Sequence, residues 1–534
     1  MGGWPPAPWD ALRMDKLDQL HIVSDLHLGG TPGHQICNQG AALGAVIDHL
    51  ASSSVAAPGE RVGLVLNGDI VDFLAAADAQ HFDPVGAPRK LQAIFDDPAF
   101  KPVWIALAGF TAVPDRVLVL VLGNHDVELA LPEVQALLLS QICGDDAARG
   151  RVRVAMDGTG YTCLVGGRRV LCIHGNDADP WNVVDHEALR DFIKAQNEGV
   201  TPRPVQPNAG TRLVIDVMNG IKLLYPFVDL LKPETVPVPG VLLALPAHLH
   251  PPLLDFARIT AQLAVGVARV ATGFLGGPSS PSPSPSPSVP ATSTPADGYR
   301  ALDLITRGNV PPPRADAALT AAAWLKQAED DFAAGLRPLE TLAAREGEEM
   351  LGLSTLFMDR VLGRDPRVAL REALQQYLSG DETFRFDTED GTYRALDAEV
   401  GPEVHFLIAG HTHLERRLPR TRGSGVYFNS GTWIRLIQIE PEQLATSDAF
   451  EPVFRALSSG RLEDLDALSN LVRQRRSMVS IWADGGQVHG ELRHAIEARP
   501  PRQPDDAPPV PPVPPVPPWE PVLGSRFTST SLER

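Results

Sequence analysis

Five short segments carry the aspartate, asparagine and histidine side chains from which proteins build metal sites. In chain order they are Asp25-Leu-His27, Gly68-Asp69-Ile-Val-Asp72, Gly123-Asn124-His125-Asp126, His174-Gly175 and Gly410-His411-Thr-His413. Carboxylate and amide oxygens with imidazole nitrogens make mixed sites that suit Mn, Fe, Zn or Co better than Ca or thiolate-selected metals. A carboxylate can also bridge two ions about 3.5–4 Å apart. Each segment alone is weak evidence, but five in order favour one shared metal site.

Short apolar runs precede most of these segments and are typical of buried strands in an α/β protein. The predicted strands are His21–Ser24, Val62–Leu66, Val117–Leu122, Tyr161–Val165, Val170–Ile173, Val404–Ala409 and Val426–Phe428. Met478–Trp482 and Gln487–Leu492 flank Asp484-Gly485-Gly486 and predict a hairpin. Functional residues of α/β sheets gather at the carboxyl ends of strands. We therefore expect an α/β fold that brings the five segments together at strand ends.

The five segments together resemble the motif set of the calcineurin-like metallophosphoesterase superfamily, which is DxH, GDxxD, GNH(D/E), a later His and GHxH. The match covers roughly residues 20–176 and 400–435, and no motif position departs from the pattern. The hairpin would complete the core. The resemblance implies a four-layer α/β/β/α metallophosphoesterase sandwich, with the site at the strand ends.

The resemblance also implies a role for each motif residue. Two ligand sets would share one bridging carboxylate: Asp25, His27 and His413 for the first ion, Asn124, His174 and His411 for the second, and Asp69 for both. His125, beside Asn124, would contact the phosphate and act as general acid, and Asp72 would orient His125. The implied activity is hydrolysis of a phosphate monoester or diester by a metal-bridging hydroxide. The implied cofactors are two divalent ions from among Mn, Fe, Zn and Co, with manganese first.

Two nearby segments leave alternatives open. Asn429-Ser-Gly-Thr-Trp433 resembles the turn that closes the family's site, or is a turn with a core tryptophan. His174-Gly-Asn-Asp-Ala-Asp179 resembles the His-Gly-Asp stretch of UDP-diacylglucosamine hydrolase, which acts on a lipid-linked pyrophosphate, but that branch carries Arg where His125 stands here. This activity is one alternative function. A catalytically silent metal-binding scaffold is another, although every predicted ligand is present.

Composition suggests how the rest of the chain is organised. We expect a loose leader at 1–18, two parts of the core at 19–180 and 401–495, a mainly helical cap insertion at 181–400 with a Pro/Ser linker at 276–298, and a Pro-rich disordered tail at 496–534. Helical stretches are predicted at Thr211–Leu231, kinked or divided by Pro226, and at Phe256–Phe274, Ala315–Leu362 and Pro366–Leu378. Since more than 200 residues separate His174 from His411, the insertion should project near the site as a lid.

Charge and composition narrow the partners. The 534 residues carry a net charge of −18, which argues against nucleic acid and leaves a phosphorylated small molecule or a lipid-linked phosphate as the expected substrate. Thr235–Leu254 has no charged residue, but its prolines argue against a spanning helix. This stretch either packs within the cap or makes a peripheral membrane contact.

The cysteines and the two ends of the chain suggest a compartment and one more partner. Four cysteines without a CxxC pair, and a start without the apolar core of a signal peptide, indicate the cytoplasm, with or without membrane attachment. The proline tract at 508–518 should be extended polyproline II. It is a spacer, or it docks a proline-binding partner.

Overall fold

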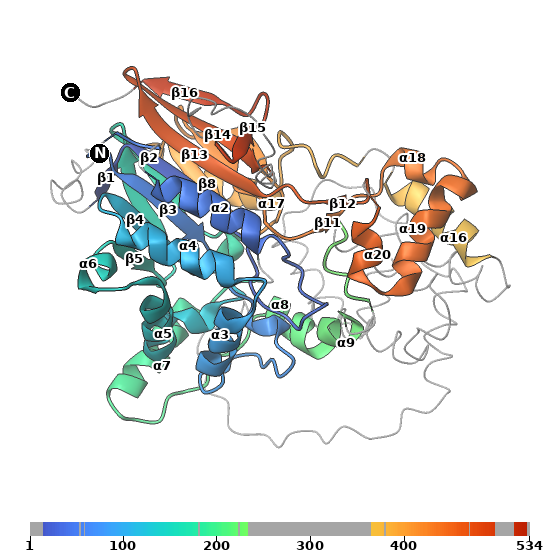
Figure 1. Cartoon of the computed structure of the whole chain (residues 1–534), viewed down its shortest axis with the longest axis horizontal. Helices are drawn as coiled ribbons and strands as arrows, with labels where there is room; N and C mark the ends of the chain where they lie inside the picture. Colours follow the sequence, from blue (N-terminus) through green and yellow to red (C-terminus); the bar gives the residue numbers. More distant parts are fainter. Residues whose placement is uncertain are drawn as a thin grey trace, which may run out of the picture. The chain divides into compact units, whose positions relative to one another are not determined.

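The protein is a mixed α/β molecule with parallel and antiparallel strand pairs, as a computed structural model shows (Figure 1). The structure describes residues 14–52, 55–57, 59–179, 182–222, 225–232, 365–378, 381–468, 470–496 and 517–530. The chain divides into two compact units. The first comprises residues 1–207, 382–435 and 474–534, and the second comprises 208–381 and 436–473. All five motif segments belong to the first unit.

The larger sheet of the first unit contains the strands that precede the first three motifs. Its strand order is β15-β14-β13-β2-β3-β4-β5, and β16 also pairs with β14. The strands are β2 (Gln19–Val23), β3 (Val62–Asn67), β4 (Arg116–Val121), β5 (Val152–Ala155), β13 (Ser477–Asp484), β14 (Gln487–Ala495), β15 (Trp519–Pro521) and β16 (Phe527–Thr530). The strands β2, β3 and β4 pair in parallel. Their carboxyl ends therefore meet at one edge.

The second sheet brings together segments that are far apart in the sequence. Its order is β1-β6-β7-β8-β10-β9. The strands are β1 (Asp15–Leu17), β6 (Tyr161–Val165), β7 (Arg168–Cys172), β8 (Phe406–Ala409), β9 (Arg416–Pro419) and β10 (Val426–Asn429). Val170 of β7 pairs in parallel with Phe406 of β8. This pairing places the segments after β7 and β8 side by side.

One hydrophobic core joins the two sheets. It contains Leu20 and Ile22 of β2, Cys163 of β6, Phe406 of β8 and Ile481 of β13, all fully buried. Burial of such apolar side chains is the main stabilising contribution to a fold of this size. The two sheets are therefore held face to face by their own apolar residues.

Helices of the first unit cover the sheets. In Figure 1, α2 (Gly40–Ala51) and α4 (Lys101–Ala112) lie along the larger sheet, and they contact each other. Tyr393 and Leu396 of α17 (Gly391–Glu399) pack with Leu407 and Tyr427 of the second sheet. The remaining elements are α3 (Ala87–Asp96), α5 (Pro132–Ile142), α6 (Asp146–Arg149), α7 (His186–Asn197) and the 3-10 turns η1 (Phe73–Ala75), η2 (Val127–Ala130) and η3 (Asn176–Ala178). Proline in the first turn of α3, α4 and α5 suits their starts, where no N–H is needed.

The second unit is helical except for one short strand pair, as far as its residues are described. It contains α8 (Ala209–Leu213), a π-helical turn (Val214–Met218), α9 (Asn219–Lys222), α16 (Pro366–Tyr377), α18 (Pro441–Leu444), α19 (Ser447–Ser459), α20 (Leu462–Asp466), β11 (Leu436–Ile437) and β12 (Val472–Arg473). The helix α16 packs against α18 and α19. The segment 436–473 thus belongs to this unit and not, as we expected, to the core.

The predicted strands are confirmed to within three residues, but the predicted bounds of the leader, the insertion and the tail are wrong. The end of the expected leader forms β1, which pairs with β6. Part of the expected disordered tail forms β15 and β16, because their extended backbones complete the ladder beside β14. The helices α7 and α17, expected in the insertion, belong to the first unit.

Several expected segments lie outside the described residues. They are Thr235–Leu254, Phe256–Phe274, the linker at 276–298, Ala315–Leu362 and the proline tract up to residue 516. Thr211–Leu231 is helical only as far as Lys222 among its described residues, and Pro226 lies in a turn beyond that helix. Within the described residues, none of the helices is long and apolar enough to cross a membrane.

Candidate metal centre

The predicted ligands follow the carboxyl ends of strands in both sheets. Asp25 follows β2, Asp69 follows β3 and Asn124 follows β4, all in the larger sheet. His174 follows β7 and His411 follows β8 in the second sheet. The main-chain N–H of His411 donates to both carboxylate oxygens of Asp25 at 3.0 Å, which joins the ligand loops of the two sheets.

The backbone is strained at the predicted ligands. Seven non-glycine residues in the described ranges have positive φ, and five of them are Asp25, His27, Asp69, His411 and His413, at 45–71°. Such a conformation costs a non-glycine residue about 1–3 kcal/mol and persists where the surroundings enforce it, commonly at functional sites. Here the neighbouring loops enforce it, since the Asp25 N–H donates to Gly68 O at 3.1 Å and the His27 N–H to Asp69 O at 2.9 Å.

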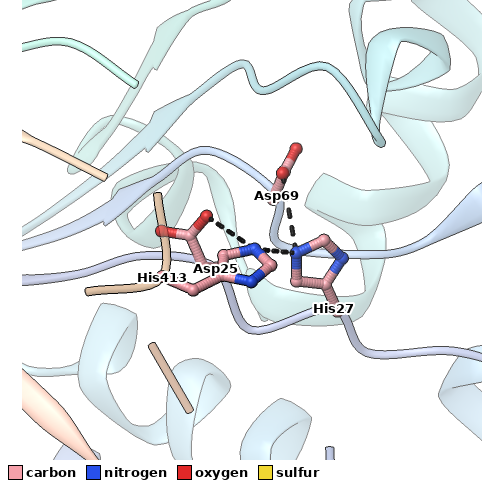
Figure 2. Close-up of side chains that lie close together, drawn as sticks. All are labelled: Asp25, His27, Asp69 and His413. Atoms are coloured by element: carbon pink, nitrogen blue, oxygen red, sulfur yellow. Dashed lines mark hydrogen bonds and ion pairs between the residues drawn. The ribbon is translucent and has the colours of Figure 1, made fainter. Parts of the chain in front are cut away.

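Four side chains converge in what we call the first cluster, Asp25, His27, Asp69 and His413 (Figure 2). His27 Nε2 lies 3.1 Å from His413 Nε2 and 3.6 Å from Asp69 Oδ2. His413 Nε2 lies 3.4 Å from Asp25 Oδ1. One ligand atom from each residue lies within 4.8 Å of all the others. Two imidazole nitrogens and two carboxylates facing one point make a suitable binding site for a divalent metal ion.

The other predicted ligands, Asn124, His174 and His411, form what we call the second group. His174 Nε2 lies 3.2 Å from Asp69 Oδ2, while its Nδ1 bonds to Asn67 O at 2.8 Å. Asn124 Oδ1 is buried and has no hydrogen-bond partner among the described residues. An unpaired buried amide oxygen is costly. A bound cation at this point would remove that cost.

His411, like His174, belongs to neither compact group of ligand atoms in the described residues, which are Asp25, His27, Asp69 and His413, and His27, Asp72 and His125. Its Nε2 lies 3.0 Å from Asp179 Oδ2, and its ring centroid lies 5.6 Å from that of His174. Asp179 Oδ2 also accepts a hydrogen bond from Asn182 Nδ2 at 2.7 Å. The sequence analysis gave neither Asp179 nor Asn182 a role, because no motif spacing connects them to the ligands.

Buried negative charge dominates the electrostatics of the centre. The carboxylates of Asp25, Asp69, Asp72 and Asp126 are at most 4 % exposed. Within the described residues, the ion pairs of Asp25, Asp69 and Asp72 are with histidines rather than lysine or arginine. Burial and the nearby Asp69 carboxylate raise the pKa of Asp126 to about 7. Buried charge of one sign is costly unless it is paired or binds a metal, so the residues present fit a bound cation.

The pKa of His174 points the same way. Burial alone would lower it, but the Asp69 carboxylate outweighs burial and raises the pKa of His174 to about 10. The histidines in turn hold the pKa of Asp69 well below its ordinary value, against the effect of burial. A positive charge between these two side chains is therefore strongly favoured, and a metal ion would take the place of the proton.

His125 lies beside the first cluster and is more accessible than its ligands. Its Nδ1 lies 3.3 Å from Asp72 Oδ1, and its side chain is 20 % exposed. The other carboxylate oxygen of Asp72 lies 3.2 Å from His27 Nδ1. Burial would raise the pKa of Asp72, but the two histidines lower it well below its ordinary value. Asp72 therefore orients one predicted ligand and His125 together.

Two motif glycines are required by close packing. A Cβ on Gly68, which has φ 85°, would overlap the His174 ring. A Cβ on Gly123 would overlap the Asp69 carboxylate. Only glycine lets these turns approach the ligand side chains so closely.

The Asn429–Trp433 turn is hydrogen-bonded to the loops that carry the predicted ligands. Asn429 Nδ2 donates to Gly410 O at 2.6 Å, and Thr432 Oγ1 donates to Asp25 O at 2.7 Å. Trp433 is fully buried and donates from Nε1 to Ser477 O at 2.9 Å. The turn therefore carries a core tryptophan and is hydrogen-bonded to the main chain of two segments that carry predicted ligands.

Glu415, two residues beyond His413, is a further support that the sequence analysis missed. This buried carboxylate pairs with Arg475 and lies 2.6 Å from His494 Nε2, and it accepts a hydrogen bond from Ser477 Oγ at 3.2 Å. These contacts fix the chain that follows His413 to β13 and β14. No motif contains Glu415, so only its position in the fold identifies it.

Comparisons of the chain with models of known families, with curated proteins and with solved structures find no match of any of the three kinds.

Proposed function

We propose that the protein is a metal-dependent phosphoric ester hydrolase of the calcineurin-like type, with two divalent ions at the centre described above. The carrying observation is that five predicted ligands, which follow strands of both sheets, adopt strained backbone conformations. Asp25, His27 and Asp69 among them are buried, and His411 and His413 are partly buried. Strain of this kind, concentrated on metal-ligand residue types, is a recognised property of functional sites.

The donor atoms suit two ions that share Asp69. Asp69 Oδ2 lies 3.6 Å from His27 Nε2 in the first cluster and 3.2 Å from His174 Nε2 in the second group. We propose Asp25, His27 and His413 for the first ion, Asn124, His174 and His411 for the second, and Asp69 for both. Bound ions would supply a nucleophile at neutral pH and positive charge for the phosphoryl oxygens. Mixed oxygen and nitrogen donors favour Mn, Fe, Zn or Co, and we propose manganese.

His125 is the proposed general acid. Asp72 accepts from His125 Nδ1 at 3.3 Å, and we propose that Nε2 faces the substrate. A carboxylate partner raises the basicity of an imidazole and holds its ring in one orientation. With 20 % of its side chain exposed, His125 can reach a leaving-group oxygen and donate a proton to it. Asn124 would contact the phosphate beside it.

The proposed fold is the four-layer α/β/β/α sandwich. It is supported by the core shared between the two sheets, by α17 packed on the second sheet, and by α2 and α4 along the larger one (Figure 1). We propose a phosphorylated small molecule or a lipid-linked phosphate as the substrate, since the net charge of −18 disfavours nucleic acid.

Hydrolysis of p-nitrophenyl phosphate and bis-p-nitrophenyl phosphate tests the proposal. Metal-stripped protein would be assayed alone and after addition of Mn²⁺, Fe²⁺, Zn²⁺ or Co²⁺. We expect turnover only with added metal, and we expect His125→Ala to reduce kcat about 100-fold or more. The preferred substrate would distinguish a monoesterase from a diesterase.

The matched control is His489→Ala. His489 lies on β14, where its Nδ1 bonds to Thr528 Oγ1 at 3.0 Å and its ring packs on Trp482. Its loss should leave kcat unchanged. Two bound ions without turnover on any phosphate ester, including lipid-linked pyrophosphates, would contradict the enzymatic proposal and favour a metal-binding scaffold.

A further inference from the structure

The segment after His174 reaches the second group through two side chains that the proposed ligand set does not include. Asp179 Oδ2 lies 3.0 Å from His411 Nε2. Asn182 donates from Nδ2 to the same oxygen of Asp179 at 2.7 Å, and its Oδ1 lies 3.4 Å from Asn124 Nδ2. Asp179 and Asn182 therefore connect two proposed ligands of the second ion.

Polar contacts hold the described residues of this segment, 175–179 and 182. Gly175 has φ 106°, which turns the chain into η3. Asn176 donates from Nδ2 to Asn182 O at 3.0 Å, so the two ends of the loop are joined. The position of Asp179 is thus set by the loop as well as by His411.

The contact between Asp179 and His411 determines which imidazole nitrogen can bind a metal. An ionised carboxylate only accepts hydrogen bonds, so His411 Nε2 carries the proton in this pair. In the neutral ring the lone pair is then on Nδ1. A carboxylate on the far nitrogen of a metal-binding histidine fixes its tautomer and ring orientation, and loss of such a partner typically weakens metal binding about 10–100-fold.

We propose that Asp179 is a positioning residue for the second metal ion, holding His411 in the Nε2-protonated tautomer so that Nδ1 binds the ion, with Asn182 linking Asp179 to Asn124. This inference rests on the proposed dinuclear function and adds a determinant of the second ion alone. Within the described residues, Asp179 contacts His411 and Asn182 rather than a side chain of the first cluster.

Metal titration of the apo-protein with Mn²⁺ or Zn²⁺, followed by calorimetry and by elemental analysis of bound metal, tests the proposal. We expect Asp179→Asn to weaken binding of the second ion about 10–100-fold and to leave the affinity for the first ion unchanged. Asp177→Asn is the matched control. It removes the same charge from the same loop. Within the described residues, Asp177 bonds to His186 at 3.2 Å, to the N–H of Val184 at 3.1 Å and to Asn176 Nδ2 at 2.9 Å rather than to a proposed ligand, and asparagine keeps an oxygen that can accept these bonds. Its two metal affinities should equal those of the wild type.

A spectroscopic measurement separates positioning from a general loss of structure. In protein labelled with ¹⁵N-histidine, with the His411 signal assigned through His411→Gln, the wild type should show the Nε2-protonated tautomer. Asp179→Asn should lose this preference while the other histidine signals remain in place.

The outcomes are distinguishable. Two ions bound with unchanged affinities in Asp179→Asn would overturn the inference and leave the proposed function intact. Equally weakened binding of both ions in Asp179→Asn would also overturn the inference. A wild type that binds two ions, with the expected response to Asp179→Asn but without turnover, would support the inference and contradict the proposed enzyme. A wild type that binds a single ion would overturn both.

Discussion

The first cluster and the second group differ in how far their ligand atoms already converge. In the first cluster, one atom from each of four side chains lies within 4.8 Å of the others. In the second group, His174 faces Asp69 at 3.2 Å, whereas the imidazole of His411 faces Asp179 at 3.0 Å. Asn124 Oδ1 is buried and has no hydrogen-bond partner in the part of the chain that the structure describes.

Two metal sites that share one carboxylate can therefore differ in how closely their free ligand atoms match the metal-bound arrangement. The free-energy cost of binding an ion is smaller when the ligand side chains already have the bound arrangement, because fewer of them must be ordered. We therefore expect the first cluster to bind its ion more tightly than the second group. Asp69, which faces both, couples the two.

The largest effect should come from Asp69→Asn, which removes the shared carboxylate. An amide offers one oxygen and no charge, so both ions should bind more weakly and kcat should fall by about 1,000-fold or more. Steady-state kinetics and elemental analysis of bound metal would measure this. Asp177→Asn, with the same chemical change on a residue that contacts no proposed ligand, serves again as the control. Unchanged activity in Asp69→Asn would exclude the bridging role.

Removing one imidazole ligand from each site in turn should show which binding step belongs to which site. His413→Ala should weaken only the tighter binding step and His411→Ala only the weaker one, with each affected affinity reduced about 100-fold. In the wild type the two steps should differ at least about tenfold, which corresponds to about 1.4 kcal/mol. Competition with a chelator of known affinity would measure both constants. Equal constants in the wild type would show that the difference in convergence has no energetic consequence.

A smaller effect is expected from changing Glu415, which holds the chain that follows His413 to β13 and β14. Burial would raise the pKa of Glu415, but His494, Arg475 and Ser477 outweigh it and lower the pKa below its ordinary value of 4.5. A lowered carboxyl pKa stabilises the fold above the unfolded-state pKa, and that contribution is lost as the pH falls. Glu415→Gln should therefore destabilise the protein by about 2 kcal/mol near pH 7.

The difference between Glu415→Gln and the wild type should shrink below about pH 4, where the wild-type carboxyl becomes protonated. Thermal unfolding of metal-free protein between pH 3 and 7 would check this. Arg385→Gln is a suitable control, since its ion pairs with Glu382 and Asp387 are exposed. A constant difference at every pH would mean that Glu415 acts by packing and not by charge.

Most motif residues and strands could be predicted from the sequence for local reasons. Runs such as Val62–Asn67 and Arg116–Val121 are apolar throughout and buried along their whole length, so their strand identity and the loops after them are visible in the sequence. The grouping of Asp25, His27, Asp69 and His413 was implied by the resemblance of the motifs to a known family, and these four form the first cluster. Their positive φ angles could not be read from the sequence, because aspartate and histidine seldom adopt them.

What only the tertiary structure decided depends on contacts between distant parts of the chain. The pairing of β7 with β8 brings His174 and His411 close together. The strands β15 and β16 lie in a segment whose composition predicted disorder, and their pairing with β14 could be seen only in the fold. Asp179 and Glu415 have no distinguishing spacing, and they matter because folding places them against His411 and behind His413. The sequence by itself determined which chemical groups this protein possesses and which strands present them. The packing of two sheets determined which of those groups meet, because side chains hundreds of residues apart become neighbours only when the shared core forms.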